Sequence, residues 1–121
     1  MTVRRLKTYT AETGYVYQYY FVGKRPALPG DPAAPAIEFI FDVSSDRKQT
    51  FAVSVFLVDK AVFEWEGKHG RDLADVEHYA ASKMMLLRAF DSIEDMMQQG
   101  RRLWIGPEEL EELLAQLGVD S

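Results

Sequence analysis

Cysteine is absent from this 121-residue chain. Its absence excludes a disulfide framework, catalysis by a thiol and zinc sites built from thiolates. Long hydrophobic runs are absent too, because the longest apolar-rich stretch, residues 51–58, is far shorter than the roughly 20 residues that cross a bilayer. No apolar stretch follows the basic residues at the start, so we expect no signal peptide. These absences predict a soluble, cytoplasmic protein with no membrane partner.

The chain also lacks the short motifs that mark common catalytic and cofactor sites. It contains no Gly-x-Ser-x-Gly elbow, no Gly-x-Gly-x-x-Gly loop, no phosphate loop ending in Gly-Lys-Ser/Thr and no His-Glu-x-x-His pair. We therefore predict no cofactor and no metal, and we favour a non-enzymatic protein over an enzyme.

What is present suits one globular domain over residues 1–121, because 47% of the residues are hydrophobic. The formal net charge is −5, but it is unevenly spread. Residues 1–25 hold five basic side chains and one acidic one, whereas residues 26–121 hold nine basic and eighteen acidic ones. Such asymmetry fits a basic arm for an anionic partner, or pairing of the two halves within the chain or across a dimer.

Alternating apolar residues predict the strands. Residues 3–10 and 15–22 form a hairpin or one bent strand, and residues 37–44 and 50–57 form a second hairpin. Residues 61–66 are either a fourth strand or a bulged continuation of the third. Four prolines within residues 24–36 predict a surface loop there.

Apolar spacings of three and four predict the helices. A long amphipathic helix is expected over residues 71–100, with Asp72 as its N-cap and Asp75 in its first turn. A short helix is expected from Pro107 to a stop at Gly118. The order predicts an α+β fold: an antiparallel sheet of about four strands, a long helix packed on one face, and a short C-terminal helix.

The aromatic segment over residues 13–22 is the leading functional candidate. Alternation places Tyr15, Tyr17 and Tyr19 on one strand face, and basic residues flank them. The stripe is either core, with an interface on the other face, or a platform on which single-stranded nucleic acid or a peptide stacks. The predicted partner-binding surface consists of Arg4, Lys7, Tyr15, Tyr17, Tyr19, Lys24 and Arg25.

A polar cluster is the rival candidate, from another class of function. His69, Asp72, Asp75 and His78 include both histidines of the chain, and such residues serve metal sites and general bases. Capping of the long helix is the simpler role for the two aspartates.

The opposite strand face predicts self-association. Apolar residues there are unlikely to face water alone, and a symmetric homodimer would cover them. They are Val16, Tyr20, Ile40, Phe56 and Val58. We therefore expect a small bacterial-type interaction or regulatory protein, homodimeric, that binds an anionic partner such as single-stranded nucleic acid through its N-terminal strands. An enzyme or metal-binding protein using the polar cluster is the alternative.

Overall fold

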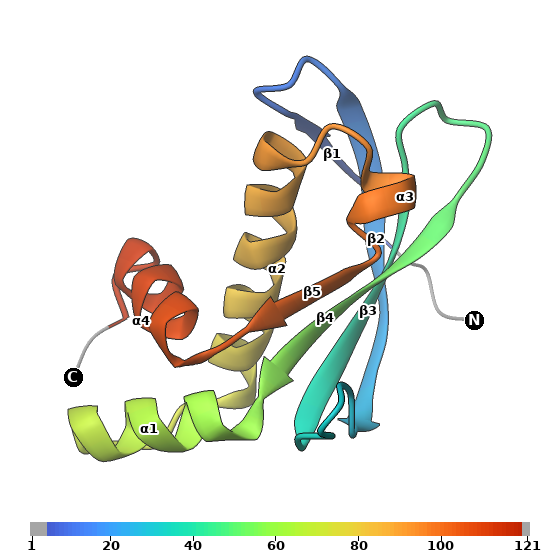
Figure 1. Cartoon of the computed structure of the whole chain (residues 1–121). Coiled ribbons are helices and arrows are strands. Elements are labelled where there is room, and N and C mark those ends of the chain that lie inside the picture. The colour runs from blue at the N-terminus through green and yellow to red at the C-terminus, as the bar shows by residue number, and fades with distance from the viewer. Residues whose placement is uncertain (1–4, 120–121) are drawn as a thin grey trace.

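The computed structural model describes residues 5–119 and has a mixed α+β fold (Figure 1). One five-stranded sheet has the order β1-β2-β3-β4-β5, and four helices accompany it. The strands are β1 (Lys7–Thr10), β2 (Val16–Ala27), β3 (Ala36–Ser44), β4 (Phe51–Val58) and β5 (Arg102–Ile105). The helices are α1 (Asp59–His69), α2 (Asp75–Ser92), α3 (Met96–Gln99) and α4 (Pro107–Gln116). The α+β class is confirmed, with five strands in place of about four.

The sheet is antiparallel from β1 to β4, and only β5 runs parallel to its neighbour. Phe41 and Val53 lie opposite each other in β3 and β4 and are both fully buried. Their face of the sheet carries the apolar residues of the alternating pattern, so its burial sets the register. We call the other face, which points away from α2, the open face.

Helix α2 lies across the buried face of the sheet (Figure 1). Its Phe90 stacks on Tyr17 of β2, with ring centroids 4.1 Å apart and planes 6° apart. At the same end the Tyr9 hydroxyl donates to Asp91 over 2.7 Å. These contacts make the aromatic stripe of β2 part of the core, as expected from the high burial of aromatic side chains.

The expected strand over residues 61–66 is wrong, because this segment belongs to α1. Ala61, Val62 and Trp65 are buried on one side of the helix, while Phe63 is 69% exposed. A strand would have placed Phe63 with Ala61 and Trp65. A short apolar run fits both the period of a helix and that of a strand, so only tertiary packing distinguishes the two structures.

The expected helix over residues 71–100 is shorter and divided. Asp72 is not its N-cap: α2 begins at Asp75, and the Glu77 side chain accepts from the Ala74 amide over 2.8 Å. At the other end Ile93 is extended, and Asp95 caps α3 by accepting from the Gln98 amide. Side chains of Asp and Ser form hydrogen bonds with nearby backbone groups. These residues are therefore found more often at the ends of helices than in their interiors.

The proline loop is also shorter than expected, because β2 continues to Ala27 and pairs with β3 up to that point. Pro26 lies in the part of β2 that β1 does not reach, where a strand tolerates proline. The remaining residues, 28–35, form what we call the strap. Pro29 within it is buried, and any side chain at Gly30 would meet the Trp104 ring at 3.4 Å.

Candidate anion-binding site on the open face of the sheet

A row of side chains crosses four neighbouring strands on the open face. Arg25 of β2 lies opposite Glu38 of β3, Glu38 lies opposite Phe56 of β4, and Phe56 lies opposite Trp104 of β5. Opposed residues of neighbouring strands point to the same side of a sheet. The row therefore brings together residues that are up to 79 positions apart in the chain, and Arg102 joins it beside Ser54.

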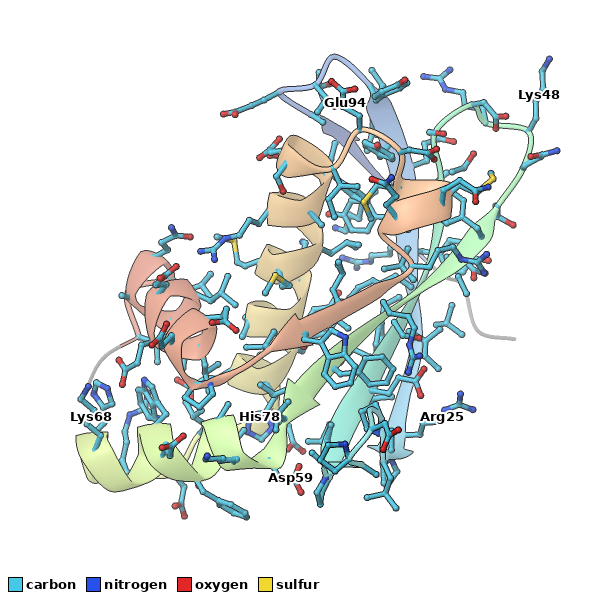
Figure 2. All side chains as sticks on the ribbon, in the orientation of Figure 1. Arg25, Lys48, Asp59, Lys68, His78 and Glu94 are labelled. Carbon is cyan, nitrogen blue, oxygen red and sulfur yellow. The ribbon has the colours of Figure 1, made fainter. Side chains whose placement is uncertain are left out.

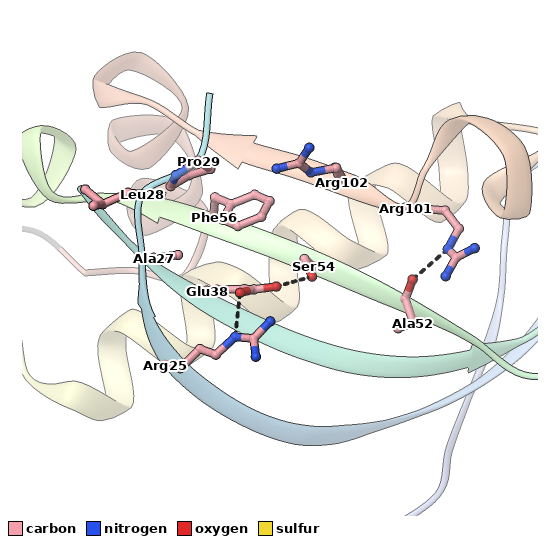
Figure 3. A pocket seen from close by; sticks show the side chains of 10 residues that line it. All are labelled: Arg25, Ala27, Leu28, Pro29, Glu38, Ala52, Ser54, Phe56, Arg101 and Arg102. Atoms are coloured by element: carbon pink, nitrogen blue, oxygen red, sulfur yellow. Dashed lines mark hydrogen bonds and ion pairs between the residues drawn. The ribbon is translucent and has the colours of Figure 1, made fainter. Parts of the chain in front are cut away.

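A cavity of about 530 Å³ lies over this row, between the sheet and the strap (Figure 3). Figure 3 shows the helices behind the sheet, on the side away from the cavity. The lining of the cavity combines three arginines, one carboxylate, one serine and five apolar residues. They are Arg25, Ala27, Leu28, Pro29, Glu38, Ala52, Ser54, Phe56, Arg101 and Arg102. A volume of this size is typical of ligand sites.

Glu38 forms the floor of the cavity and is only 7% exposed. Arg25 Nε donates to Glu38 Oε1 over 2.8 Å, and Ser54 Oγ donates to Glu38 Oε2 over 2.6 Å (Figure 3). Burial raises the pKa of the Glu38 carboxyl, but these bonds and the charges of Arg25 and Arg102 outweigh it. The pKa of Glu38 is therefore lowered, and the carboxylate is ionised at neutral pH. The same hydrogen bond raises the pKa of Arg25.

Arg101 and Arg102 supply positive charge that no carboxylate neutralises by direct contact. Among residues 5–119, neither arginine forms an ion pair. Arg101 Nε donates to the Ala52 carbonyl over 2.9 Å, and the Arg102 guanidinium lies 5.1 Å from the centroid of the Phe56 ring. Their remaining donors are available to an anion, for which guanidinium is well suited.

The apolar side of the site is aromatic. The Phe56 and Trp104 rings lie with centroids 5.0 Å apart, and Trp104 is 39% exposed while Phe56 is buried. A partly exposed indole offers aromatic surface on which a planar group can stack.

Charge is divided between the two layers of the fold. The four helices carry ten acidic and four basic side chains, whereas the five strands carry four basic and two acidic ones. The negative net charge of the chain therefore lies mainly on the helical side, away from the cavity.

The residues of the predicted partner-binding surface have separate positions. Tyr17 and Tyr19 are 1% and 5% exposed beneath α2, so their rings are closed to a ligand, while Tyr15 is 48% exposed. Lys24 and Arg25 point to opposite faces of β2. Lys24 lies 6.0 Å from the Phe39 ring centroid and 3.8 Å from Asp75, on the helical side. Lys7 is exposed on the edge strand β1, opposite Tyr19, and Arg4 lies outside the described residues. Arg25 is the predicted residue that lines the cavity.

His69 belongs to a contact between two helices. Its Nε2 lies 2.8 and 3.0 Å from the two carboxylate oxygens of Glu111 on α4. Its ring stacks on Trp65 of α1, with centroids 4.2 Å apart. These contacts join α1 to α4.

The other members of the predicted polar cluster lie before or on α2. His78 is on α2 (Figure 2), and its Nδ1 lies 3.9 Å from Asp75. Asp72 is exposed in the segment that precedes the helix. Within residues 5–119, no group of three or more His, Cys, Asp or Glu residues is placed to hold a metal ion. The structure thus brings His78 near Asp75 without a hydrogen bond between them, and it gives His69 a different partner.

Sequence reasoning overlooked most of the residues around the cavity. The long helix was expected to end at residue 100, just before Arg101 and Arg102, and the short strand β5 was not expected. The sequence does contain a pattern typical of a strand here. Residues 101–105 lie between Gly100 and Gly106, and Leu103 and Ile105 alternate with Arg102 and Trp104. Read with period two, this run predicts a strand with its polar face outward.

The described part of the chain contains no helix with the length and apolar character needed to cross a membrane. No family model matches the chain, and neither the curated proteins nor the solved structures include one that is similar to it.

Proposed function

We propose that this chain is a non-enzymatic protein that binds single-stranded nucleic acid on the open face of its sheet. One observation carries the proposal: two arginines without a carboxylate partner among residues 5–119 line a cavity next to an exposed indole. The arginines are Arg101 and Arg102, and the indole is that of Trp104. The proposed binding surface is therefore not the aromatic stripe of β2, which is largely buried. It lies on the opposite side of the same sheet.

The chemistry of a single strand fits both halves of this site. Its phosphates accept paired hydrogen bonds from guanidinium groups, and their neutralisation releases counterions. Its unpaired bases stack on aromatic rings and on guanidinium planes.

The acidic net charge does not oppose this proposal, because acidic side chains are concentrated on the helices. Electrostatic interactions between exposed charges fade beyond about 8–10 Å at physiological salt. An anionic strand at the cavity is therefore influenced mainly by the arginines that line it.

Fluorescence anisotropy of a labelled single-stranded oligonucleotide tests the proposal across a series of salt concentrations. Three phosphate contacts on a single strand give a slope of about −2 for the logarithm of the binding constant against that of the salt concentration. The double variant Arg101→Ala/Arg102→Ala should reduce the steepness by about 1.4, because each lost contact removes about 0.7.

Lys60→Ala is the matched control, since it removes one exposed positive charge from α1, on the helical side. We expect it to leave both affinity and slope unchanged. Equal losses in the control and in the arginine variants would show that attraction is non-specific. Absence of binding at low salt would end the proposal.

A homodimer and a cytoplasmic location remain part of this proposal. Part of the apolar surface that motivated the dimer is already covered within the chain, because Phe56 is only 4% exposed and contacts Arg102 and Trp104. Val16, 39% exposed on the same face of the sheet, still supports a partner copy.

A further inference from the structure

Glu38 is an unexpected residue at the floor of a basic cavity. A carboxylate repels phosphate, so a site for phosphate alone gains nothing from it. We propose that Glu38 reads the base of the bound strand and makes the site prefer guanine. This inference rests on the proposed function and names the nucleotide that the site selects.

The bonds of Glu38 leave room for two further donors. An ionised carboxylate accepts at about four lone-pair positions and donates nothing. Arg25 occupies one position on Oε1, and Ser54 occupies one on Oε2. One acceptor position therefore remains on each oxygen.

Guanine is the base whose Watson–Crick edge matches this pair of acceptors. It presents two adjacent donors, the N1–H and the exocyclic amino group on C2. Adenine and cytosine present one amino group on that edge, and thymine and uracil present one imino group. A bidentate contact of this kind discriminates against the wrong base by about 1–3 kcal/mol, which corresponds to roughly fivefold to 150-fold in affinity.

The neighbours of Glu38 hold a base at the right place. Arg102 lies opposite Ser54, whose hydroxyl donates to Glu38, so the guanidinium and the carboxylate are adjacent on the open face. The Arg102 guanidinium covers Phe56 and offers its other side to a base, with the Trp104 ring alongside. A base stacked there lies about one to two strand spacings, roughly 5–10 Å, from β3. Its edge can then meet the Glu38 carboxylate, while Arg101 and the edge N–H groups of Arg102 hold the flanking phosphates.

Short thymidine oligonucleotides with one variable central base test this inference by anisotropy. A single guanine per strand avoids association of guanine-rich strands. We expect the guanine strand to bind about tenfold more tightly than strands with adenine, cytosine or thymine at that position. Inosine, which keeps N1–H but lacks the amino group on C2, should lose most of this advantage.

Glu38→Gln supplies the matching change in the protein, since it replaces one of the two acceptors with a donor. We expect the guanine strand to lose its advantage over the thymidine strand in this variant. Asp42→Asn is the control, because Asp42 lies on the same face of β3 and bonds to the Tyr20 hydroxyl without lining the cavity. The melting temperature of each variant reports whether it folds, and the comparison of guanine with inosine requires no variant.

The outcomes separate this inference from the proposed function. Equal binding of all strands would overturn guanine reading and leave single-strand binding intact. A preference that survives Glu38→Gln would also overturn it. No binding of any strand would overturn both. Free guanosine monophosphate as a competitor distinguishes the two sources of the base: we expect it to compete only weakly, and equal potency would support guanine reading but overturn the strand as the ligand.

Discussion

Phe90 explains why the aromatic stripe of β2 is core rather than a binding surface. Its ring lies 4.1 Å from Tyr17, 5.8 Å from Tyr19 and 6.0 Å from Tyr9, measured between centroids. Burial raises the pKa of the Tyr17 and Tyr19 hydroxyls. The residues that best resembled a stacking platform are thus used to hold α2 on the sheet.

Truncation of Phe90 should therefore be costly. We expect Phe90→Ala and Phe41→Ala each to lower the free energy of unfolding by about 3–5 kcal/mol, because both rings are fully buried. Urea unfolding followed by circular dichroism measures the change. Phe63→Ala, at a ring that is 69% exposed, is the control and should change stability by less than about 1 kcal/mol. A similarly small loss at Phe90 or Phe41 would contradict the assigned core.

Glu77 gives the fold a measurable dependence on acid. The ion pair with Arg71 and the bond from the Ala74 amide lower the pKa of Glu77 from 4.5 to about 2. Because the folded-state pKa is the lower one, the unfolded state binds more protons between these values, and stability falls as the pH drops through this window.

Glu77→Gln should reduce stability at neutral pH and flatten its fall between pH 4.5 and about 2. Urea unfolding at several pH values measures both effects. Glu64→Gln is the control on an exposed carboxylate of α1. If stability fell with acid in Glu77→Gln as it does in the unmodified protein, the ion pair of Glu77 with Arg71 would not contribute to the pH dependence.

At the scale of elements, the strap shows how a loop becomes part of a site. Its Gly30 has φ +94°, a conformation that glycine adopts easily and other residues rarely do. The same glycine approaches the Trp104 ring, so the strap and β5 contact each other over the open face. The surface loop expected over residues 24–36 is therefore strand in its first part and, in the strap, makes contacts across the sheet.

Gly30→Ala should disturb this contact. The added methyl would lie 3.3 Å from the Pro32 carbonyl oxygen and 3.4 Å from the Trp104 ring, in addition to the backbone strain of about 1–2 kcal/mol. We expect lower thermal stability and a shift in Trp104 fluorescence, measured with Trp65 replaced by Phe.

Gly14→Ala is the matched control, with φ +96° and no atom within 4 Å of the added methyl. It should lower stability through backbone strain alone and leave Trp104 fluorescence unchanged. Equal fluorescence shifts in both variants would show that the strap does not contact Trp104.

At the scale of the whole molecule, self-association is the open prediction. We expect a homodimer that covers apolar residues left exposed by the single chain, and light scattering at micromolar concentration measures it directly. Val16→Glu should shift the mass toward that of a monomer if the sheet is the interface, because a charge buried without a partner is costly. Val76→Glu, on a residue that is 71% exposed on α2, is the control. A monomeric mass for the unmodified chain would contradict the prediction.

Local patterns predicted those elements whose neighbours in space are also neighbours in sequence. The hairpin of β3 and β4 alternates strictly and was predicted within one or two residues, and α4 begins at the expected Pro107. By contrast, α1 was mistaken for a strand because Ala61, Val62 and Trp65 fit either period over so short a run. Of the residues around the cavity, the sequence singled out Arg25 for the partner-binding surface and Phe56 for the apolar face expected in a dimer.

By itself, the sequence determined the chemistry that is available: no thiol, no catalytic or cofactor motif, enough apolar residues for a core, and basic residues next to aromatic ones. Tertiary structure decided where that chemistry lies. The parallel pairing of β5 with β4 joins segments nearly fifty residues apart and brings Arg102 beside Ser54 and Glu38. The packing of α2 then selected which face of the sheet is core. In β2, where both faces carry apolar and aromatic residues, the two-residue period did not say which face is buried, because that depends on the helix that covers it.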